Sequence, residues 1–427
     1  MKMEGTKMDG PLNDELRNSK DISLVYVSIP FCETRCHFCC FARAFVSDLF
    51  SLQELKSAYL KALKHEIQVK AFYFAAKHGV NLKAVNFGGG TPTLLEAQDL
   101  QDILSCIVGS FGQKVEDIKD ISIEATPDSL TLSKLKQLRD AGFNRISIGA
   151  QTFQKQILNK LNRAHSVEEF FDAFDRARLA GFKNINIDLL YDIPSQTLED
   201  VISDLEVAVR IDPEHISPSP LLPVKSVLFE TGSEKNNQVL TRGNGWASRV
   251  HEFLGERGFQ NYFHKYFSKV GRESITELVY SYDIPHIGIG AGAASWLGDN
   301  PTDIKTYISR PVSSGMFPKD TPHNPLRGIN RMLLFPEGIY MPYFSERYGC
   351  DLEELVTNPG LELDYFTIFR NCPQETMEGI RKLEKETVMA IKGWEEKGAI
   401  EKKGDYLRIT PSARFSQDAW GLYMSSI

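Results

Sequence analysis

The sequence predicts an α/β protein built on a parallel sheet. Six short segments typical of β-strands recur along its first half, and a helical stretch follows each. Polar and glycine-rich residues stand directly after several of these segments. Because parallel strands are joined by crossover helices, the alternation favours βαβ units. The chemistry of such a sheet gathers at the carboxyl ends of its strands.

The expected strands are residues 23–30, 83–89, 120–126, 145–151, 184–193 and 214–222. The Val, Ile and aromatic content of the first four or five suits buried parallel strands. The expected helices between them include residues 51–79, 128–142 and 167–181. The last two end on Gly142 and Gly181, and glycine commonly ends a helix.

Composition limits the class of protein. A chain of 427 residues allows two or three domains, and 42% hydrophobic with 25% charged residues is typical of a globular protein in water. A net charge of −7 argues against a nucleic-acid partner. No apolar run reaches the roughly 18 residues of a transmembrane segment. Seven cysteines without a secretory signal indicate a reducing, cytoplasmic location.

We expect three parts: a flexible N-terminus (1–20), a core (21–310) and a C-terminal accessory domain (311–427). The accessory domain begins with a linker rich in Pro and Ser at 311–325. Residues 387–415 then show a helix, a turn at a glycine and a small hairpin. This pattern is typical of a mainly helical, winged-helix-like module, which we expect to act as a lid or a packing module.

Three cysteines carry the clearest chemistry. Cys32, Cys36 and Cys39 follow the first strand with C-x3-C-x2-C spacing. Three thiolates on one loop can hold three irons of a [4Fe–4S] cluster. The fourth iron then stays open, and an open metal position is typical of a catalytic site. S-adenosylmethionine (SAM), whose amino and carboxylate groups can chelate that iron, is the expected ligand.

Zinc is the alternative ligand for this loop. It usually needs a second pair of cysteine or histidine ligands downstream. Cys106, Cys350 and Cys372 stand singly, which favours the cluster. Cys40 is expected to be a small buried hydrophobe rather than a fourth ligand.

A glycine-rich turn, Gly88-Gly89-Gly90-Thr91-Pro92, follows the second strand. Glycines allow the backbone to approach a ligand closely, so we interpret the turn as a SAM contact. The alternative is a plain strand-to-helix turn.

Two carboxylates, Glu124 and Asp188, interrupt otherwise apolar strands. Buried carboxylates need partners, and SAM offers ribose hydroxyls, an ammonium and a sulfonium. Gln151 and Arg163 are suited to the amide-like and carboxylate edges of SAM. The alternative is that a structural salt bridge to Arg145 or Arg163 satisfies the carboxylates.

An ordered set of motifs resembles one enzyme family. It comprises YVSIPFCETRCHFC, FGGGTPT, SIEATP, RISIGAQTF, LNRAHS and NIDLLYDIPSQT, within about residues 20 to 300. This set is similar to the radical SAM enzymes related to oxygen-independent coproporphyrinogen III oxidase. The resemblance implies a partial (β/α)6 TIM-like barrel with a C-terminal accessory domain. It also implies reduced flavodoxin or ferredoxin as the electron donor.

The resemblance also implies roles for individual residues. Cys32, Cys36 and Cys39 would bind the cluster. The residues matching contacts to the cluster-bound SAM are Tyr26, Phe38, Gly89 and Glu124, with Gly88 beside them. Those matching a second SAM site are Gly90, Thr91, Gln151, Arg163 and Asp188. The expected catalytic side chains are Tyr26, Glu124 and Asp188.

Differences between this sequence and the related oxidases and heme chaperones indicate which activity to expect. Phe41 stands where the oxidase has a further cysteine, Ser28 replaces the usual His, and the HNxxYW stretch of heme chaperones is absent. The stretch GRESITELVYSYDIPHIGIGAGAAS is similar to class C radical SAM methyltransferases. We therefore expect methylation of an sp2 carbon of an aromatic, quinone or tetrapyrrole substrate, with two SAM molecules. The alternatives are a tetrapyrrole-processing oxidase or ring-opening enzyme, and a heme chaperone.

Overall fold

The computed structural model describes most of residues 19–295 and shorter pieces of the chain on either side. The described ranges are 15–16, 19–39, 44–45, 52–76, 78–221, 236–295, 298–299, 304–309, 332, 339–348, 352, 399–403 and 406–409. Predictions for the N-terminal residues 1–14, for Cys40, for the linker 311–325 and for the helix at 387–398 lie outside them. In the described part of the chain, every helix is too short or too polar to cross a bilayer.

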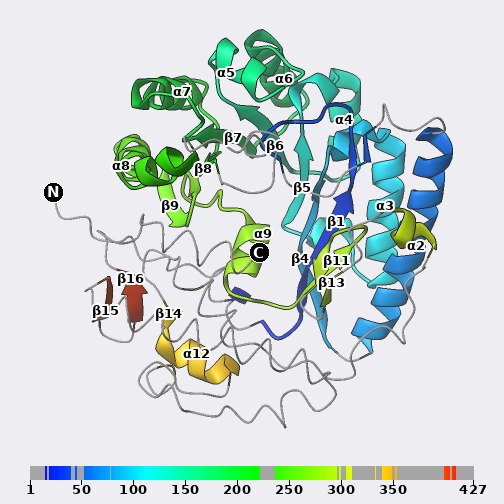
Figure 1. The fold of residues 1–427 in the computed structure, drawn as a ribbon. Coiled ribbons are helices and arrows are strands. Elements are labelled where there is room, and N and C mark those ends of the chain that lie inside the picture. The colour runs from blue at the N-terminus through cyan, green and yellow to red at the C-terminus, as the bar shows by residue number, and fades with distance from the viewer. Residues whose placement is uncertain are drawn as a thin grey trace.

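The core is an open, curved sheet with the strand order β11-β1-β4-β5-β6-β7-β8-β10-β9 (Figure 1). Neighbours from β11 to β8 are parallel, and the β10 and β9 hairpin is antiparallel. The bounds are β1 Ile22–Ile29, β4 Val80–Gly89, β5 Asp120–Ala125, β6 Arg145–Gln151, β7 Ile185–Tyr191, β8 His215–Pro220, β9 Gln260–Phe263, β10 Tyr266–Ser268 and β11 His286–Ile289. All six predicted strands are therefore present, and the predicted α/β class with a parallel sheet is confirmed.

Helices cover the outer face of this sheet (Figure 1). They are α2 Leu52–Ala75, α3 Ala97–Ser110, α4 Leu132–Asp140, α5 Lys155–Lys160, α6 Val167–Leu179, α7 Leu198–Arg210, α8 Asn236–Gly255 and α10 Ile304–Ser309. Local sequence explains where several begin and end. Ser166 and Thr197 each start a helix with a capping box. Gly142 and Gly181, just past α4 and α6, have φ of 107° and 93°, as glycine at such ends permits.

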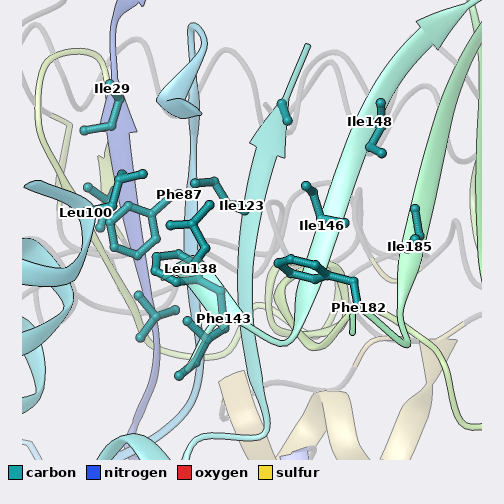
Figure 2. Close-up of a cluster of buried hydrophobic side chains, with 14 of the residues drawn as sticks. Ile29, Phe87, Leu100, Ile123, Leu138, Phe143, Ile146, Ile148, Phe182 and Ile185 are labelled. Atoms are coloured by element: carbon teal, nitrogen blue, oxygen red, sulfur yellow. The ribbon is translucent and has the colours of Figure 1, made fainter. Parts of the chain in front are cut away.

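Side chains of the parallel strands alternate between two faces. The outward ones are apolar and pack against the helices, as Figure 2 shows for Phe87, Ile123, Ile146 and Ile148. Helix residues Leu100 and Leu138 complete this layer. Successive strand residues point to opposite faces, so the same strands present their other residues to the inside.

The inward residues of β5 to β8 are largely polar. They include Ser122, Glu124, Arg145, Ser147, Asn186, Asp188, His215 and Ser217. Register places them in neighbouring pairs, for example Glu124 beside Ser147 and Asp188 beside Ser217. The space enclosed by the sheet is therefore a polar lumen, which we define by these inward residues of β5 to β8.

Helix α9 (Ile275–Ser281) closes the bottom of the enclosed space, at the amino ends of the strands. Its residues Ile275, Leu278 and Val279 form one apolar cluster with inward Leu24 of β1 and Ala84 of β4. Described C-terminal residues join this same cluster. They are Met332, Ile339, Phe344, Leu352, Ile400, Leu407 and Ile409. The described part of the accessory region thus packs at the end opposite to the carboxyl ends of the strands.

The accessory region contains the predicted hairpin. Its strands are β15 Ile400–Lys403 and β16 Tyr406–Ile409, and β14 Ile339–Tyr340 pairs with β16. Helix α12 (Met341–Tyr348) follows β14. Short pairs also join β2 Phe31–Cys32 to β3 Ala44–Phe45, and β12 Ala294–Ser295 to β13 Gly298–Asp299.

The strands at both edges of the sheet were not predicted from the sequence. β11 has only four residues, His286–Ile289, and lies in a glycine-rich stretch. It nevertheless pairs in parallel with β1. The β9 and β10 hairpin continues the sheet beyond β8. Such short edge strands depend on pairing with their neighbours, which local composition does not record.

A buried ion pair anchors the chain after β11. Glu66 and Lys70 of α2 lie 2.7 Å apart, with side chains 0% and 2% exposed. Lys70 Nζ donates to the Gly288 carbonyl at 2.6 Å, and the Gly290 N–H donates to Glu66 at 2.8 Å. Tyr307 also donates to Glu66, at 2.5 Å. Both charges are therefore paired and hydrogen bonded, as buried charges must be.

Lys70→Met should lower the free energy of unfolding by roughly 3–5 kcal/mol, because it leaves the Glu66 carboxylate buried without its cation. Lys64→Met is the matched control on the same helix. Lys64 pairs with Asp102 at 3.0 Å, but its side chain is 39% exposed, so its loss should cost less than about 1 kcal/mol. Urea denaturation followed by circular dichroism measures both; equal losses would contradict the anchoring role of Lys70.

Candidate functional site

One cavity opens at the carboxyl ends of the parallel strands. Its volume is about 370 Å³, within the range of small-molecule sites. Loops after β1 and β4 line one side, and β5, β6, β7 and β8 line the floor and the other side. The predicted site residues among those lining it are Cys32, Cys36, Phe38, Cys39, Gly89, Gly90, Thr91, Glu124, Gln151, Arg163 and Asp188. Segments far apart in the sequence thus meet at one place, as expected from the sequence.

The three cysteine thiols face this cavity, and neighbouring side chains donate to two of them. Arg163 Nη1 lies 3.4 Å from Cys36 Sγ, and Thr91 Oγ1 lies 3.8 Å from Cys32 Sγ. Donors directed at sulfur stabilise a thiolate and tune a bound iron–sulfur cluster. Phe38, between the second and third cysteines, packs against an apolar cluster with Leu161 and Ile193.

The glycine turn closely approaches the cysteine loop. The Gly90 N–H donates to the Ile29 carbonyl and the Thr91 N–H to the Phe31 carbonyl, at 2.9 and 2.8 Å. A Cβ atom on Gly90 would lie 2.6 Å from the Phe31 carbonyl oxygen, closer than any real contact. Gly89 has φ of 103°, which side chains rarely adopt. The turn thus needs glycine, and it fixes the loop against β4.

Tyr26 and Gly88 lie beneath the lining rather than in it. The Tyr26 hydroxyl and the Glu124 carboxylate both approach Gly88, where a Cβ atom would lie 2.7 Å from that hydroxyl. Tyr26 and Gly88 thus belong to the wall that supports Glu124, and neither residue is among those lining the cavity. Burial, with Glu124 close by, raises the pKa of Tyr26 well above its usual value, so its hydroxyl stays protonated.

Glu124 and Asp188 differ in what surrounds them. Burial, followed by the charges of Asp188 and Glu277, raises the pKa of the Glu124 carboxyl to about 8. Asp188 instead accepts two hydrogen bonds, from Ser147 Oγ at 2.6 Å and from Asn186 Nδ2 at 2.8 Å. Neither carboxyl forms a salt bridge with arginine within the described residues, so the structural salt-bridge alternative is not supported.

Gln151 and Arg163 lie at the rim of the cavity. Gln151 ends β6 with φ of 69°, an uncommon left-handed conformation that turns the chain away from the sheet. Arg163 Nη2 donates to the Gly149 carbonyl at 2.8 Å, while Arg163 Nε is buried without a hydrogen-bond partner. An unsatisfied buried donor is costly, and an acceptor on a bound ligand would satisfy it.

Several lining residues were not predicted. Lys265, from the turn between β9 and β10, and Ser147, from β6, both face the cavity. Ser147 could have been found, because it stands at an inward position of an isoleucine-rich strand. Lys265 carries no such pattern, since only the folding of the hairpin brings it to the site.

The site suits the predicted cofactors. Three thiols, a tight glycine turn and an orphaned guanidinium nitrogen lie around one cavity. Across the described chain, no three His, Cys, Asp or Glu side chains stand together as ligands of a single metal ion. A [4Fe–4S] cluster does not need three side chains around one metal ion, because each thiolate binds a different iron. Cys32, Cys36 and Cys39 would hold the cluster, and Arg163 would face the carboxylate of SAM.

Comparison with known proteins identifies the family. Residues 26–208 match the radical SAM superfamily. The heme chaperone HemW of Bacillus subtilis is 31% identical over 344 residues, which cover 77% of this chain and 88% of the relative. The chain is a radical SAM protein of the HemN/HemW branch. The oxygen-independent coproporphyrinogen III oxidase of Escherichia coli is 34% identical over 312 residues, or 68% of this chain and 66% of the relative.

A solved structure supports the fold of this radical SAM protein. The coproporphyrinogen III oxidase HemN from Escherichia coli aligns with a TM-score of 0.68 at 19% identity, covering 97% of this chain and 93% of that one. Membership of the superfamily implies a [4Fe–4S] cluster and SAM. The relatives support the oxidase and chaperone alternatives better than the class C methyltransferase expected from the sequence. The number of SAM molecules stays a prediction.

Replacing Cys36 by Ala should abolish cluster assembly, because only two loop thiolates would remain. After anaerobic reconstitution the wild type should hold about four irons per chain and the variant close to none. Cys106→Ala, which alters a cysteine outside the cavity, is the matched control and should keep its iron. Iron and sulfide analysis with electron paramagnetic resonance measures this; full iron in the Cys36 variant would contradict the assignment.

Glu124→Gln should change how stability depends on pH. Burial raises the folded-state pKa of Glu124 from 4.5 to about 8, so the neutral carboxyl stabilises the folded protein fully below about pH 4.5. That stabilisation is lost as the pH rises through about 8. Glutamine does not titrate. Without SAM, the variant should therefore gain stability relative to wild type between about pH 5 and 8, then level off. Urea denaturation across this pH range measures the unfolding free energy of both proteins. A difference between them that does not change with pH would refute the raised pKa of Glu124.

Proposed function

We propose that this chain is a radical SAM enzyme that acts on a tetrapyrrole, in the manner for which its oxidase relatives are named. The observation that carries the proposal is the single cavity shared by the cysteine loop, the glycine turn, Glu124 and Asp188. The named relatives supply the substrate class. Bound cluster and SAM would supply one-electron cleavage of SAM and hydrogen abstraction from the substrate.

The chain's own residues contribute binding and orientation. Arg163 holds Cys36 with one nitrogen and the Gly149 carbonyl with another, so its guanidinium is fixed beside the cluster loop. Asp188 is fixed by two donors. Rigid groups of this kind keep reacting atoms in close and aligned contact, which is a large part of an enzyme's advantage.

Glu124 has a distinct role at neutral pH. Because its pKa is raised to about 8, the carboxyl is largely protonated in the cavity and can donate a hydrogen bond. Asp188, which accepts from two neighbours, complements it as an acceptor. The pair thus offers one donor and one acceptor to ligand groups on the cavity floor.

Basic side chains at two places in the cavity lining, beside the acidic Glu33, Glu124, Asp128 and Asp188, are suited to carboxylates of a ligand. Among the described residues that line the cavity, Arg163 and Lys265 are basic. Arg163 contacts the cysteine loop and would face SAM. Lys265 lies on the hairpin side, with its Nζ 5.3 Å from the centre of the Tyr266 ring. We assign Lys265 to a propionate of the tetrapyrrole, since an ammonium binds carboxylates by a charge-assisted hydrogen bond.

The test is an anaerobic reaction of reconstituted protein, reduced with dithionite that is then removed, with SAM, coproporphyrinogen III and a one-electron acceptor that takes the electron released when the substrate radical loses carbon dioxide. We expect 5′-deoxyadenosine and loss of carbon dioxide from the porphyrinogen. Lys265→Met should raise KM for this substrate about tenfold, from loss of one charged contact, and leave kcat nearly unchanged. Lys269→Met is the matched control, because Lys269 pairs with Asp212 at the surface. If the product instead gained a deuterated methyl group from methyl-deuterated SAM, the proposal would be wrong and the chain would be a methyltransferase.

A heme chaperone is the second candidate. The observation that favours it is coverage: the chaperone relative matches 77% of this chain and 88% of its own length, against 68% and 66% for the oxidase. Heme titration followed by absorbance distinguishes the two. Stoichiometric heme binding without any modified product would favour the chaperone over the enzyme.

A further inference from the structure

Beneath Asp188, buried polar side chains form a continuous hydrogen-bond chain through the polar lumen. Tyr262 OH lies 2.8 Å from His215 Nε2, and His215 Nδ1 lies 2.5 Å from Asn186 Oδ1. Asn186 Nδ2 donates to Ser147 Oγ at 2.6 Å and to Asp188 Oδ1 at 2.8 Å. Tyr262 and His215 are each 1% exposed, and Asn186 is 3% exposed.

The lower end of the chain is Tyr262. The backbone N–H of Ser274, which precedes α9, donates to the Tyr262 oxygen at 3.2 Å. A backbone N–H is only a donor, so the oxygen of Tyr262 accepts there and its own proton is available for His215 Nε2. With Tyr262 donating to Nε2, His215 carries its own proton on Nδ1, which the contact with Asn186 Oδ1 on the other side of the ring requires.

The opposite direction is excluded by the contacts. If Nε2 of His215 carried the proton, bare Nδ1 would face Asn186 Oδ1 at 2.5 Å, placing two acceptors in contact. Ser217 Oγ also donates to Asn186 Oδ1, at 2.9 Å. With two donors on its oxygen, the Asn186 amide must turn its NH₂ group toward Ser147 and Asp188.

The upper end of the chain is Asp188. Asn186 donates to one carboxylate oxygen and Ser147 to the other, the latter at 2.6 Å. Every proton of the chain therefore points toward the cavity, and both oxygens of Asp188 act as acceptors. Each oxygen keeps a lone pair for a donor on a ligand. Two adjacent hydroxyls, as on the ribose of SAM, match a carboxylate held in this way.

We propose that Tyr262, His215 and Asn186 are positioning residues that orient Asp188 to accept hydrogen bonds from the ribose hydroxyls of SAM. This deepens the proposed function, in that it rests on SAM occupying the cavity, but it does not depend on the tetrapyrrole. Burial lowers the pKa of His215 well below its usual value, which keeps the ring neutral and preserves the direction of the chain.

The first test needs no ligand. Protein labelled with ¹⁵N-histidine should show a neutral ring protonated on Nδ1 that disappears in His215→Asn, while the signal of His286, which also donates from Nδ1 to a carbonyl, remains. A signal for His215 protonated on Nε2, or a doubly protonated ring at neutral pH, would overturn the proposal. Because neither SAM nor substrate is added, this outcome is independent of the proposed function.

The second test measures SAM binding to anaerobically reconstituted protein by equilibrium dialysis, without turnover. His215→Leu and Asp188→Ala should each weaken SAM binding roughly tenfold, and the double variant should be no weaker than either. His215→Asn, which keeps a donor toward Asn186, should bind nearly as wild type. Additive losses in the double variant would overturn the proposal.

A matched control separates positioning from general destabilisation. His286→Leu makes the same change at another buried histidine, which is 2% exposed. The His286 ring bonds the Ile284 carbonyl and is not part of the polar lumen. This variant should leave the SAM affinity within about twofold of wild type. If His286→Leu weakened SAM binding as much as His215→Leu, the effect would be structural and the proposal would fail. Normal SAM binding with no product from any tetrapyrrole would instead refute only the proposed function.

Discussion

The structure depends on the strict alternation of side chains along its parallel strands. Each strand of the central sheet directs isoleucines and other apolar residues outward to the helices and its remaining residues inward. A shift of one residue in any strand would exchange the two sets, burying carboxylates under helices and exposing isoleucines. The apolar layer therefore fixes the register, and the register fixes which polar groups meet inside. The packing of the apolar core thus determines which polar side chains form the site.

The alternation also explains why a polar interior is tolerated. A buried polar group without partners is costly, whereas a fully satisfied network can be stable and rigid. Asn186 shows how this is done: its oxygen accepts from His215 and Ser217, and its nitrogen donates to Ser147 and Asp188. The same groups that satisfy one another leave Asp188 with acceptor capacity facing the cavity. Stability and ligand binding thus use one set of hydrogen bonds.

Much of the core and of the cavity was predictable from local pattern. Most of the six strands were found because Val, Ile and aromatic residues mark them, and Cys32, Cys36 and Cys39 because their spacing has few other uses. Strand ends then placed Thr91, Glu124 and Asp188 at one mouth. The edge strand β11 and Lys265 could not be predicted, since their positions depend on pairing between segments distant in the chain. Tyr26 was placed in the right strand, but its depth depended on the neighbouring glycine, Gly88.

The choice among activities was the part that pattern could not decide. Methyltransferase, oxidase and chaperone share the fold, so the cysteine loop and the glycine turn are compatible with all three. The stretch that suggested methylation contains β11 and α9, and much of it serves the architecture: α9 closes the bottom of the lumen, and Gly288 and Gly290 bind the Glu66–Lys70 pair. Resemblance there reflects packing as much as chemistry.

The main-chain amide of Ser274 has a consequence for how this protein can change over evolutionary time. Side chains above it are replaceable, but an amide hydrogen is present whatever residue other than proline occupies that position. Substitutions in the lumen can interrupt the succession of donors and acceptors, yet they leave this donor to the lowest side chain in place. One end of the buried hydrogen-bond chain is therefore held by the backbone, and descendants of this chain can vary the side chains above it without losing that donor.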